Sequence, residues 1–339
     1  MEPMDINGLI EYLKREKNIE VSEKHQYALM NMGYYHGYKG YRYIQSPQNR
    51  IPYTEFEQLA AIYEFDSKVK ALFYPCVMTI ETALKNHVLE VVVSQAHSDS
   101  FVDVYNMLLN TYKTEMAAIQ QEKSYEKKKR AREKAKKEIK RRLELRNRIY
   151  KVQTDAFANG NRIADHFLNN DRNIPIWGIF ELLSMGEFGH FVSCLNGSCR
   201  RMIAEKIGME QKGDTQAMLP QRVIYAVKDL RNAIAHNDVV FDTRFRTSGI
   251  DKQVSTAVED KTQIKDITFD TITDWLILIV YLLNLLHVNP KEMEAAITAF
   301  ECASEELRKK IPISVYTRII HTDAKRKLEG LKMFASEKA

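Results

Sequence analysis

Residues 221–242 read QRVIYAVKDLRNAIAHNDVVFD, with apolar residues recurring at every third or fourth position. An α-helix turns by about 100° per residue, so four of these side chains fall within about 60° of one another. Such a stripe is typical of a helix that packs one side against a core. We therefore predict an amphipathic helix from about residue 216 to residue 236, with a buried stripe formed by Val223, Val227, Leu230 and Ile234.

The opposite side of this helix carries polar residues. Asn232 and His236 are four positions apart, so they share one face, and Asp229 lies beside them. Arg231 lies at the edge of the apolar stripe. We predict that the helix exposes Asp229, Asn232 and His236 near its C-terminal end.

These residue types suit the cleavage of RNA. A general base must take the proton of the ribose 2′-hydroxyl, a general acid must protonate the departing 5′-oxygen, and a cation must stabilise charge on the phosphate. Histidine titrates near neutrality, and arginine grips phosphate oxygens in a planar fork. Arg231, Asn232 and His236 are therefore the candidate catalytic residues. The simpler alternative is a salt bridge or cap at the end of an ordinary helix.

One such helix supplies one histidine, whereas the reaction uses both an acid and a base. A second copy of the chain would supply the complementary group, so we expect a homodimer with facing motifs. We expect no metal and no other cofactor, because His190, Cys194 and Cys199 lack a fourth zinc ligand nearby. Glu81 and Glu181 either orient the candidate residues or form buried caps and salt bridges.

The composition predicts an all-α fold. Only 13 glycines and 8 prolines occur in 339 residues, and 45% of the residues are hydrophobic. This argues for a helical bundle with a real core and against a turn-rich β architecture. We see no internal repeat.

The chain is expected to be cytoplasmic. Its first residues are charged where a secretion signal would be apolar, and its four cysteines lack the spacing of a disulfide framework. The longest apolar run, WLILIVYLLNLLHV at 275–288, is shorter than the roughly 20 residues that span a bilayer. A buried helix explains this run better.

Positive charge is concentrated in one segment. Residues 123–148 hold 14 Lys and Arg against four Glu, although the net charge of the whole chain is only +5. This helical segment is expected to bind the RNA backbone, the alternative being a solvated, self-paired helix. The candidate RNA-binding residues here are Lys127, Lys128, Lys129, Arg130, Arg132, Lys136, Lys137, Lys140, Arg141 and Arg142.

A second group of candidates lies near the N-terminus, where six tyrosines fall between residues 27 and 43. Tyrosine rings can stack on unpaired bases, with nearby cations on the phosphates. Packing in the interior, with bonded hydroxyls, is the alternative and ranks first. The candidate RNA-binding residues here are Tyr34, Tyr35, Tyr38, Lys39 and Arg42.

Changes in composition and turn signals divide the chain into five expected segments. Thr54 and Glu57 have the spacing of a capping box and should begin a long helix, which Pro75 should kink or break. The segments are an N-terminal helical part with a Tyr/Gly-rich loop (1–53), the first core helices (54–100), a basic helical insertion (101–170), the core with the RNxxxH motif (171–290) and a C-terminal helical part (291–339).

Arg231-Asn232-Ala-Ile-Ala-His236 resembles the R-x4-6-H motif of the HEPN ribonucleases. Within that superfamily the chain is similar to the Abi-like (AbiD- and AbiF-type) abortive-infection proteins of bacteria. The resemblance rests on five blocks in order between about residues 30 and 240. They are Met32-Gly-Tyr-Tyr35…Gly40-Tyr41, Ile62-Tyr-Glu-Phe-Asp66…Lys70, Ile80-Glu-Thr-Ala-Leu-Lys-Asn86, Pro175-Ile-Trp177…Glu181-Leu-Leu-Ser-Met-Gly-Glu-Phe188 and the RNAIAHN segment.

This resemblance implies a HEPN-type helical bundle and metal-independent RNA cleavage that leaves a 2′,3′-cyclic phosphate and a 5′-hydroxyl. It also implies active sites built by a dimer, a role in antiphage defence, and, for some members, association with a small non-coding RNA. Such proteins often carry a second arginine shortly after the histidine. Here Asn237-Asp238 follows, and the nearest arginine is Arg244.

Two other functions fit the same features. The chain could be a non-catalytic module that holds a structured RNA on its basic segment. It could also be the toxin of a toxin–antitoxin pair.

Overall fold

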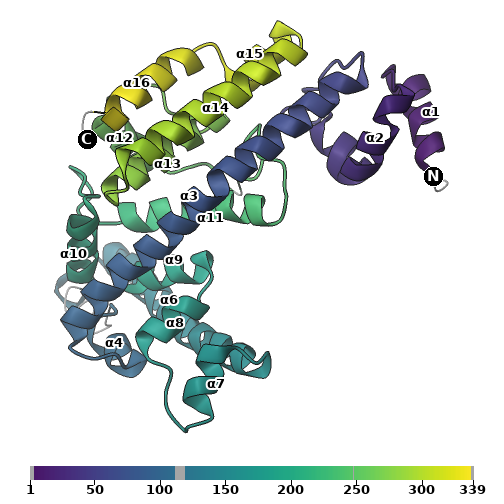
Figure 1. The fold of residues 1–339 in the computed structure, drawn as a ribbon. Coiled ribbons are helices and arrows are strands. Elements are labelled where there is room, and N and C mark those ends of the chain that lie inside the picture. The colour runs from purple at the N-terminus through teal and green to yellow at the C-terminus, as the bar shows by residue number, and fades with distance from the viewer. Residues whose placement is uncertain (1–3, 111–118, 247, 337–339) are drawn as a thin grey trace. The chain divides into compact units, whose positions relative to one another are not determined.

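The computed structural model describes residues 4–110, 119–246 and 248–336, except for the side chains of residues 34–36. These residues form helices and only three isolated backbone bridges, with no β-strand among them, so the all-α prediction is confirmed (Figure 1). The chain divides into two compact units. The first comprises Met1–Ile80 and Asp229–Ala339, and the second comprises Glu81–Lys228.

Two helices, α3 (Phe56–Ala96) and α11 (Leu219–Ala235), contribute residues to both units. The other elements of the first unit are α1 (Ile6–Lys17), η1 (Glu23–His25), α2 (Gln26–Met32), the π-helical η2 (Gly33–Lys39), α12 (Lys252–Thr262), α13 (Ile272–Leu285), α14 (Pro290–Lys310), α15 (Ile313–Ile320) and α16 (Ala324–Ser336).

The core of the first unit is built around α13. Every side chain from Ile272 to Asn284 is buried, and α12, α14, α15 and α16 pack against this helix. The apolar run near residue 280 is therefore an interior helix, as its length predicts. No helix in the described ranges has the length and apolar character needed to cross a bilayer.

The second unit contains α4 (Phe101–Met107), α6 (Tyr125–Ala158), α7 (Arg162–Leu168), α8 (Ile176–Leu182), α9 (Met185–Cys194) and α10 (Gly197–Ile207). The long helix α6 packs against α7, α8 and α9 through the buried side chains of Leu145 and Ile149. Phe180 of α8 meets Phe188 and Phe191 of α9, with ring centroids 5.6 and 5.0 Å apart.

Of the kink or break predicted at Pro75, the break does not occur, because α3 continues through the proline as one helix of 41 residues. Proline removes one backbone hydrogen bond and costs about 3 kcal/mol in a helix interior. Phe73 and Val77, on either side of the proline, are buried. The Cys76 thiol also lies 3.6 Å from the Leu72 carbonyl, to which it donates. Burial of the surrounding apolar face holds the helix together.

In place of the capping box predicted from Thr54 and Glu57, Thr54 is linked to the Gln58 side chain at the start of α3. Gln58 accepts from the Thr54 backbone N–H at 3.1 Å and donates to the Thr54 hydroxyl at 3.0 Å. Glu57 instead forms ion pairs with Lys24 and His25. The sequence pattern places the start of the helix at Thr54, two residues before its observed start at Phe56. It does not predict the ion pairs of Glu57 with Lys24 and His25.

Candidate active site at the end of helix α11

The apolar stripe of α11 is buried as predicted, with Val223, Val227, Leu230 and Ile234 at 9% exposure or less. The polar side differs in two respects, since Asp229 is buried and Asn232 is half-buried, whereas both were predicted to be exposed. The buried face is wider than the predicted stripe because it includes the small residues Ala226 and Ala233. Asp229 lies on that side of the helix.

The helix ends directly before His236. The His236 backbone N–H donates to the Asn232 carbonyl at 2.9 Å, and Asn237 then adopts a left-handed conformation with φ of 56°. The Asn237 and Asp238 amides donate to Ile234 and Ala233 at 3.2 and 2.8 Å, which is the Schellman pattern of a helix C-terminus. Asparagine tolerates this left-handed position better than most residues.

This ending leaves the candidate residues accessible to different degrees. His236 is exposed, whereas Arg231 and Asn232 are half-buried. An Arg231 Nη1–H donates to Asn232 Oδ1 at 3.4 Å. The imidazole is therefore open to solvent just past the helix end, and the guanidinium, in the last turns of the helix, is partly sheltered.

A buried ion pair from α3 holds the segment that follows His236. Lys70 Nζ lies 2.9 Å from the Asp66 carboxylate, and both residues are buried. The same ammonium donates to Asn237 Oδ1 at 2.6 Å and to the Asp238 carbonyl at 3.4 Å. Lys70 therefore fixes the left-handed residue that ends α11.

The Asp66 carboxylate has three further donors. Its Oδ1 accepts from the amides of Val240 and Phe241 at 2.8 and 2.6 Å, and its Oδ2 accepts from the Tyr41 hydroxyl at 2.6 Å. Burial raises the pKa of the Tyr41 phenol, and the adjacent Asp66 charge raises that pKa further, so the hydroxyl stays a donor. Burial also raises the pKa of the Asp66 carboxyl, while Lys70 and the other donors act in the opposite direction.

Asp66 and Lys70 belong to one of the five blocks that resemble the Abi-like proteins, but the sequence alone predicts no role for them. A signal was present: an acid and a base four residues apart, on the same helix as the apolar residues Phe65 and Val69. Charged residues on an apolar face are rarely buried unless they are paired.

The nearest arginine after the motif is already bound within the first unit. Arg244 forms an ion pair with Asp242 at 2.6 Å, donates to the Tyr43 carbonyl at 2.6 Å and lies over the Tyr43 ring at 4.2 Å. Asp242 also accepts from the Gln45 amide at 2.5 Å. The Arg244 guanidinium therefore links Asp242 to Tyr43 and has a structural role.

The basic candidates on α6 fall into two groups. Arg141 donates to the Ser193 hydroxyl at 2.7 Å, and Arg142 donates to the Tyr105 carbonyl at 2.9 Å while lying over the Tyr105 ring. These two arginines face the body of the second unit. Lys128 is half-buried, and the exposed residues of the set are Lys127, Lys129, Arg130, Arg132, Lys136, Lys137 and Lys140.

The N-terminal candidates are less open than a stacking platform requires. Tyr38 is 5% exposed, and Lys39 and Arg42 are half-buried. The side chains of Tyr34 and Tyr35 lie outside the described part of the structure. Tyr38 is therefore not an open surface for bases, and it lines a pocket instead.

The two glutamates considered as orienting residues both belong to the second unit. Glu81 is buried and pairs with Lys85 at 3.0 Å, and Lys85 also donates to the Leu183 carbonyl at 2.7 Å. Glu181 is exposed. Glu81 thus acts in a buried ion pair, one of the two roles foreseen for it.

The family model described as Abi-like protein matches residues 27–242, which include the Asp66–Lys70 pair and the end of α11. No curated protein and no solved structure matches the chain significantly.

Proposed function

The chain belongs to the Abi-like protein family, and on this premise we propose that it is an endoribonuclease of bacterial antiphage defence by abortive infection. It would cleave RNA without a metal ion, in the manner of HEPN ribonucleases. The observation that carries the proposal is the exposed imidazole of His236 at a firmly held helix end, four residues after Asn232, whose side chain accepts from Arg231.

In the proposed reaction, the ribose 2′-hydroxyl attacks the adjacent phosphorus while a base removes its proton. The bond from phosphorus to the 5′-oxygen breaks, and an acid protonates that oxygen. The products are a 2′,3′-cyclic phosphate and a 5′-hydroxyl. His236 is the proposed acid or base, Arg231 stabilises the phosphate charge, and Asn232 holds the imidazole or the phosphate through hydrogen bonds.

The second proton-transfer group is proposed to come from another copy of the chain. Two exposed helix ends related by a twofold axis would place one His236 on each side of a shared cleft. The active species is then a homodimer, and a single chain would hold half of the machinery.

RNA association is the second part of the proposal. Seven exposed cations of α6 are available to a polyanion, and in the described ranges only Lys140 among them forms an ion pair, at 3.6 Å to Glu144. This face suits backbone contact with substrate or with a small non-coding RNA. It also favours the alternative function, a module that holds RNA without cutting it.

Cleavage of a labelled single-stranded RNA in excess EDTA separates these functions. Wild-type protein should cut, and His236→Ala should reduce cutting by at least about 100-fold, the usual contribution of a general acid or base. The matched control is His166→Ala, which removes another exposed histidine, this one in α7. Binding without cutting by wild-type protein would favour the non-catalytic module, and equal loss in both variants would contradict a role for His236.

A further inference from the structure

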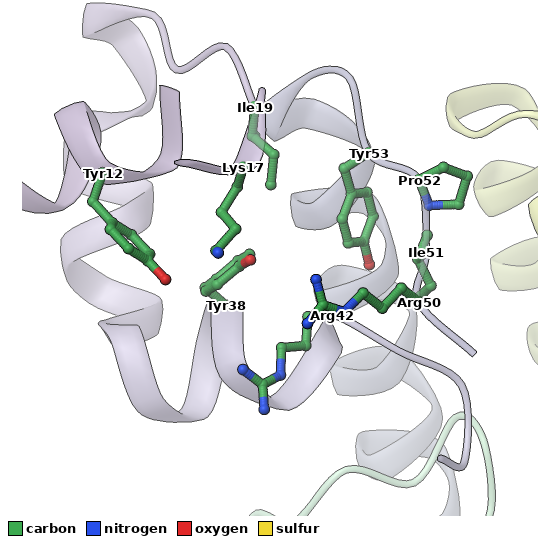
Figure 2. A pocket seen from close by; sticks show the side chains of 9 residues that line it. All are labelled: Tyr12, Lys17, Ile19, Tyr38, Arg42, Arg50, Ile51, Pro52 and Tyr53. Atoms are coloured by element: carbon green, nitrogen blue, oxygen red, sulfur yellow. The ribbon is translucent and has the colours of Figure 1, made fainter. Parts of the chain in front are cut away.

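A pocket of about 240 Å³ lies in the N-terminal part of the first unit. Figure 2 shows Tyr12 on one side, Arg50 and Tyr53 on the other, and Lys17, Tyr38 and Arg42 between them. Ile19, Ile51 and Pro52 complete the lining. The residues come from α1, from the end of η2 and from the segment that precedes α3.

The charge of this pocket is entirely positive. Among the residues that the structure describes, Lys17, Arg42 and Arg50 line it, and no acidic side chain does. Within the described ranges, none of these three cations takes part in an ion pair, although Lys17 lies 5.0 Å from the Tyr12 ring and Arg42 5.6 Å from the Tyr43 ring. Three cations that line one pocket, with no carboxylate among its described lining residues, favour an anion, and guanidinium groups match phosphate geometry in particular.

The rest of the lining is aromatic and apolar. Tyr12 and Tyr38 contribute rings next to the cations, and Ile19 and Ile51 contribute aliphatic surface. Aromatic rings beside arginines are the usual partners of a nucleobase joined to a phosphate. The pocket volume is slightly below the roughly 300–1,000 Å³ typical of small-molecule sites, which fits one nucleotide unit better than a longer strand.

The walls of the pocket are fixed by hydrogen bonds. The Ile51 amide donates to the Arg42 carbonyl at 3.0 Å, and the Tyr53 hydroxyl donates to the Tyr41 carbonyl at 2.5 Å. On the other side, the Glu20 amide donates to the Thr54 carbonyl at 3.2 Å. Because these segments are already ordered, binding a ligand in the pocket carries a smaller entropic cost.

We propose that this pocket binds a nucleoside 5′-phosphate, with the phosphate on Arg42, Arg50 and Lys17 and the base against the half-buried ring of Tyr12. The site is separate from His236, so the proposal does not depend on nuclease activity. The same chemistry is offered by a free nucleotide and by the 5′-phosphorylated end of an RNA.

Isothermal titration of the full chain with the four nucleoside 5′-monophosphates tests the proposal. At least one should bind with a Kd below about 1 mM, and the matching nucleoside should bind at least about tenfold more weakly. Arg50→Gln and Lys17→Gln should each weaken binding about tenfold. The control Arg15→Gln removes an equal charge from α1 outside the pocket and should leave the Kd unchanged.

Competition in the His236→Ala background, where RNA stays intact, identifies the source of the nucleotide. A 5′-phosphorylated RNA hexamer that displaces the bound monophosphate identifies an RNA end as the ligand. If the hexamer fails to displace it, the ligand is a free nucleotide. The proposal is overturned if no monophosphate binds, if Arg15→Gln weakens binding as much as Arg50→Gln, or if a 5′-hydroxyl hexamer competes equally well.

Discussion

Four residues after His236 are bound by one ion pair of α3. Lys70 reaches Asn237 and Asp238, and Asp66 accepts from the amides of Val240 and Phe241. The imidazole itself is exposed, so its position depends on the backbone beneath it. Asp66 and Lys70 are therefore positioning residues for the proposed chemistry.

Replacing Lys70 with methionine should be costly. The change leaves the buried Asp66 carboxylate without its cation, and breaking one side of a buried pair costs about 3–5 kcal/mol. The control is Lys68→Met on the same helix, because Lys68 pairs with Glu64 and Glu306 at the surface and should contribute about 0–1 kcal/mol. Urea unfolding measures both values. Similar losses in the two variants would contradict the role given to Lys70.

Asn237 separates backbone strain from side-chain bonding. Asn237→Gly keeps the left-handed conformation but loses the bond to Lys70, whereas Asn237→Ala loses the bond and also forces a Cβ into a left-handed residue. The free energy of unfolding of the alanine variant should be about 1 kcal/mol lower than that of the glycine variant. Thermal melts at matched concentration measure this difference, and equal stability would show that the turn is not constrained.

At the scale of elements, the sequence pattern predicts which helix faces are buried but not which distant residues contact them. The stripe of α11 and the apolar run of α13 follow from spacing alone, and both are buried as expected. The burial of Asp229, the unbroken course of α3 through Pro75 and the use of Gln58 in place of Glu57 depend on packing from elsewhere in the chain. The Asp66 contact with Val240 joins residues 174 positions apart, which periodicity does not reveal.

Helix α6 carries a prediction about RNA affinity. The triple variant Lys127→Gln, Lys129→Gln, Arg130→Gln removes three exposed cations and should lower the slope of log affinity against log salt by about 2 for a single strand. The control variant Lys291→Gln, Lys309→Gln, Lys325→Gln removes three exposed cations from α14 and α16. Fluorescence anisotropy across a salt series compares them. An equal change of slope would mean that net charge, and not the α6 face, governs binding.

At the scale of the whole molecule, the proposed dimer predicts a particular response to mixing. If one cleft needs His236 from both protomers, an equal mixture of wild-type and His236→Ala chains with free exchange leaves roughly a quarter of the dimers active. Independent monomers would instead keep about half of the activity. Initial cleavage rates against the fraction of mutant chain distinguish a quadratic from a linear decline, and a linear decline would contradict the shared cleft.

The most direct measurement of the proposed chemistry is the identity of the ends left on cut RNA. Mass spectrometry of a defined single-stranded RNA, cut by wild-type protein in excess EDTA, should find a 2′,3′-cyclic phosphate on one fragment and a 5′-hydroxyl on the other. Neither end should form with His236→Ala. Fragments that carry a 3′-hydroxyl and a 5′-phosphate, or cyclic-phosphate ends that persist in His236→Ala, would contradict the account.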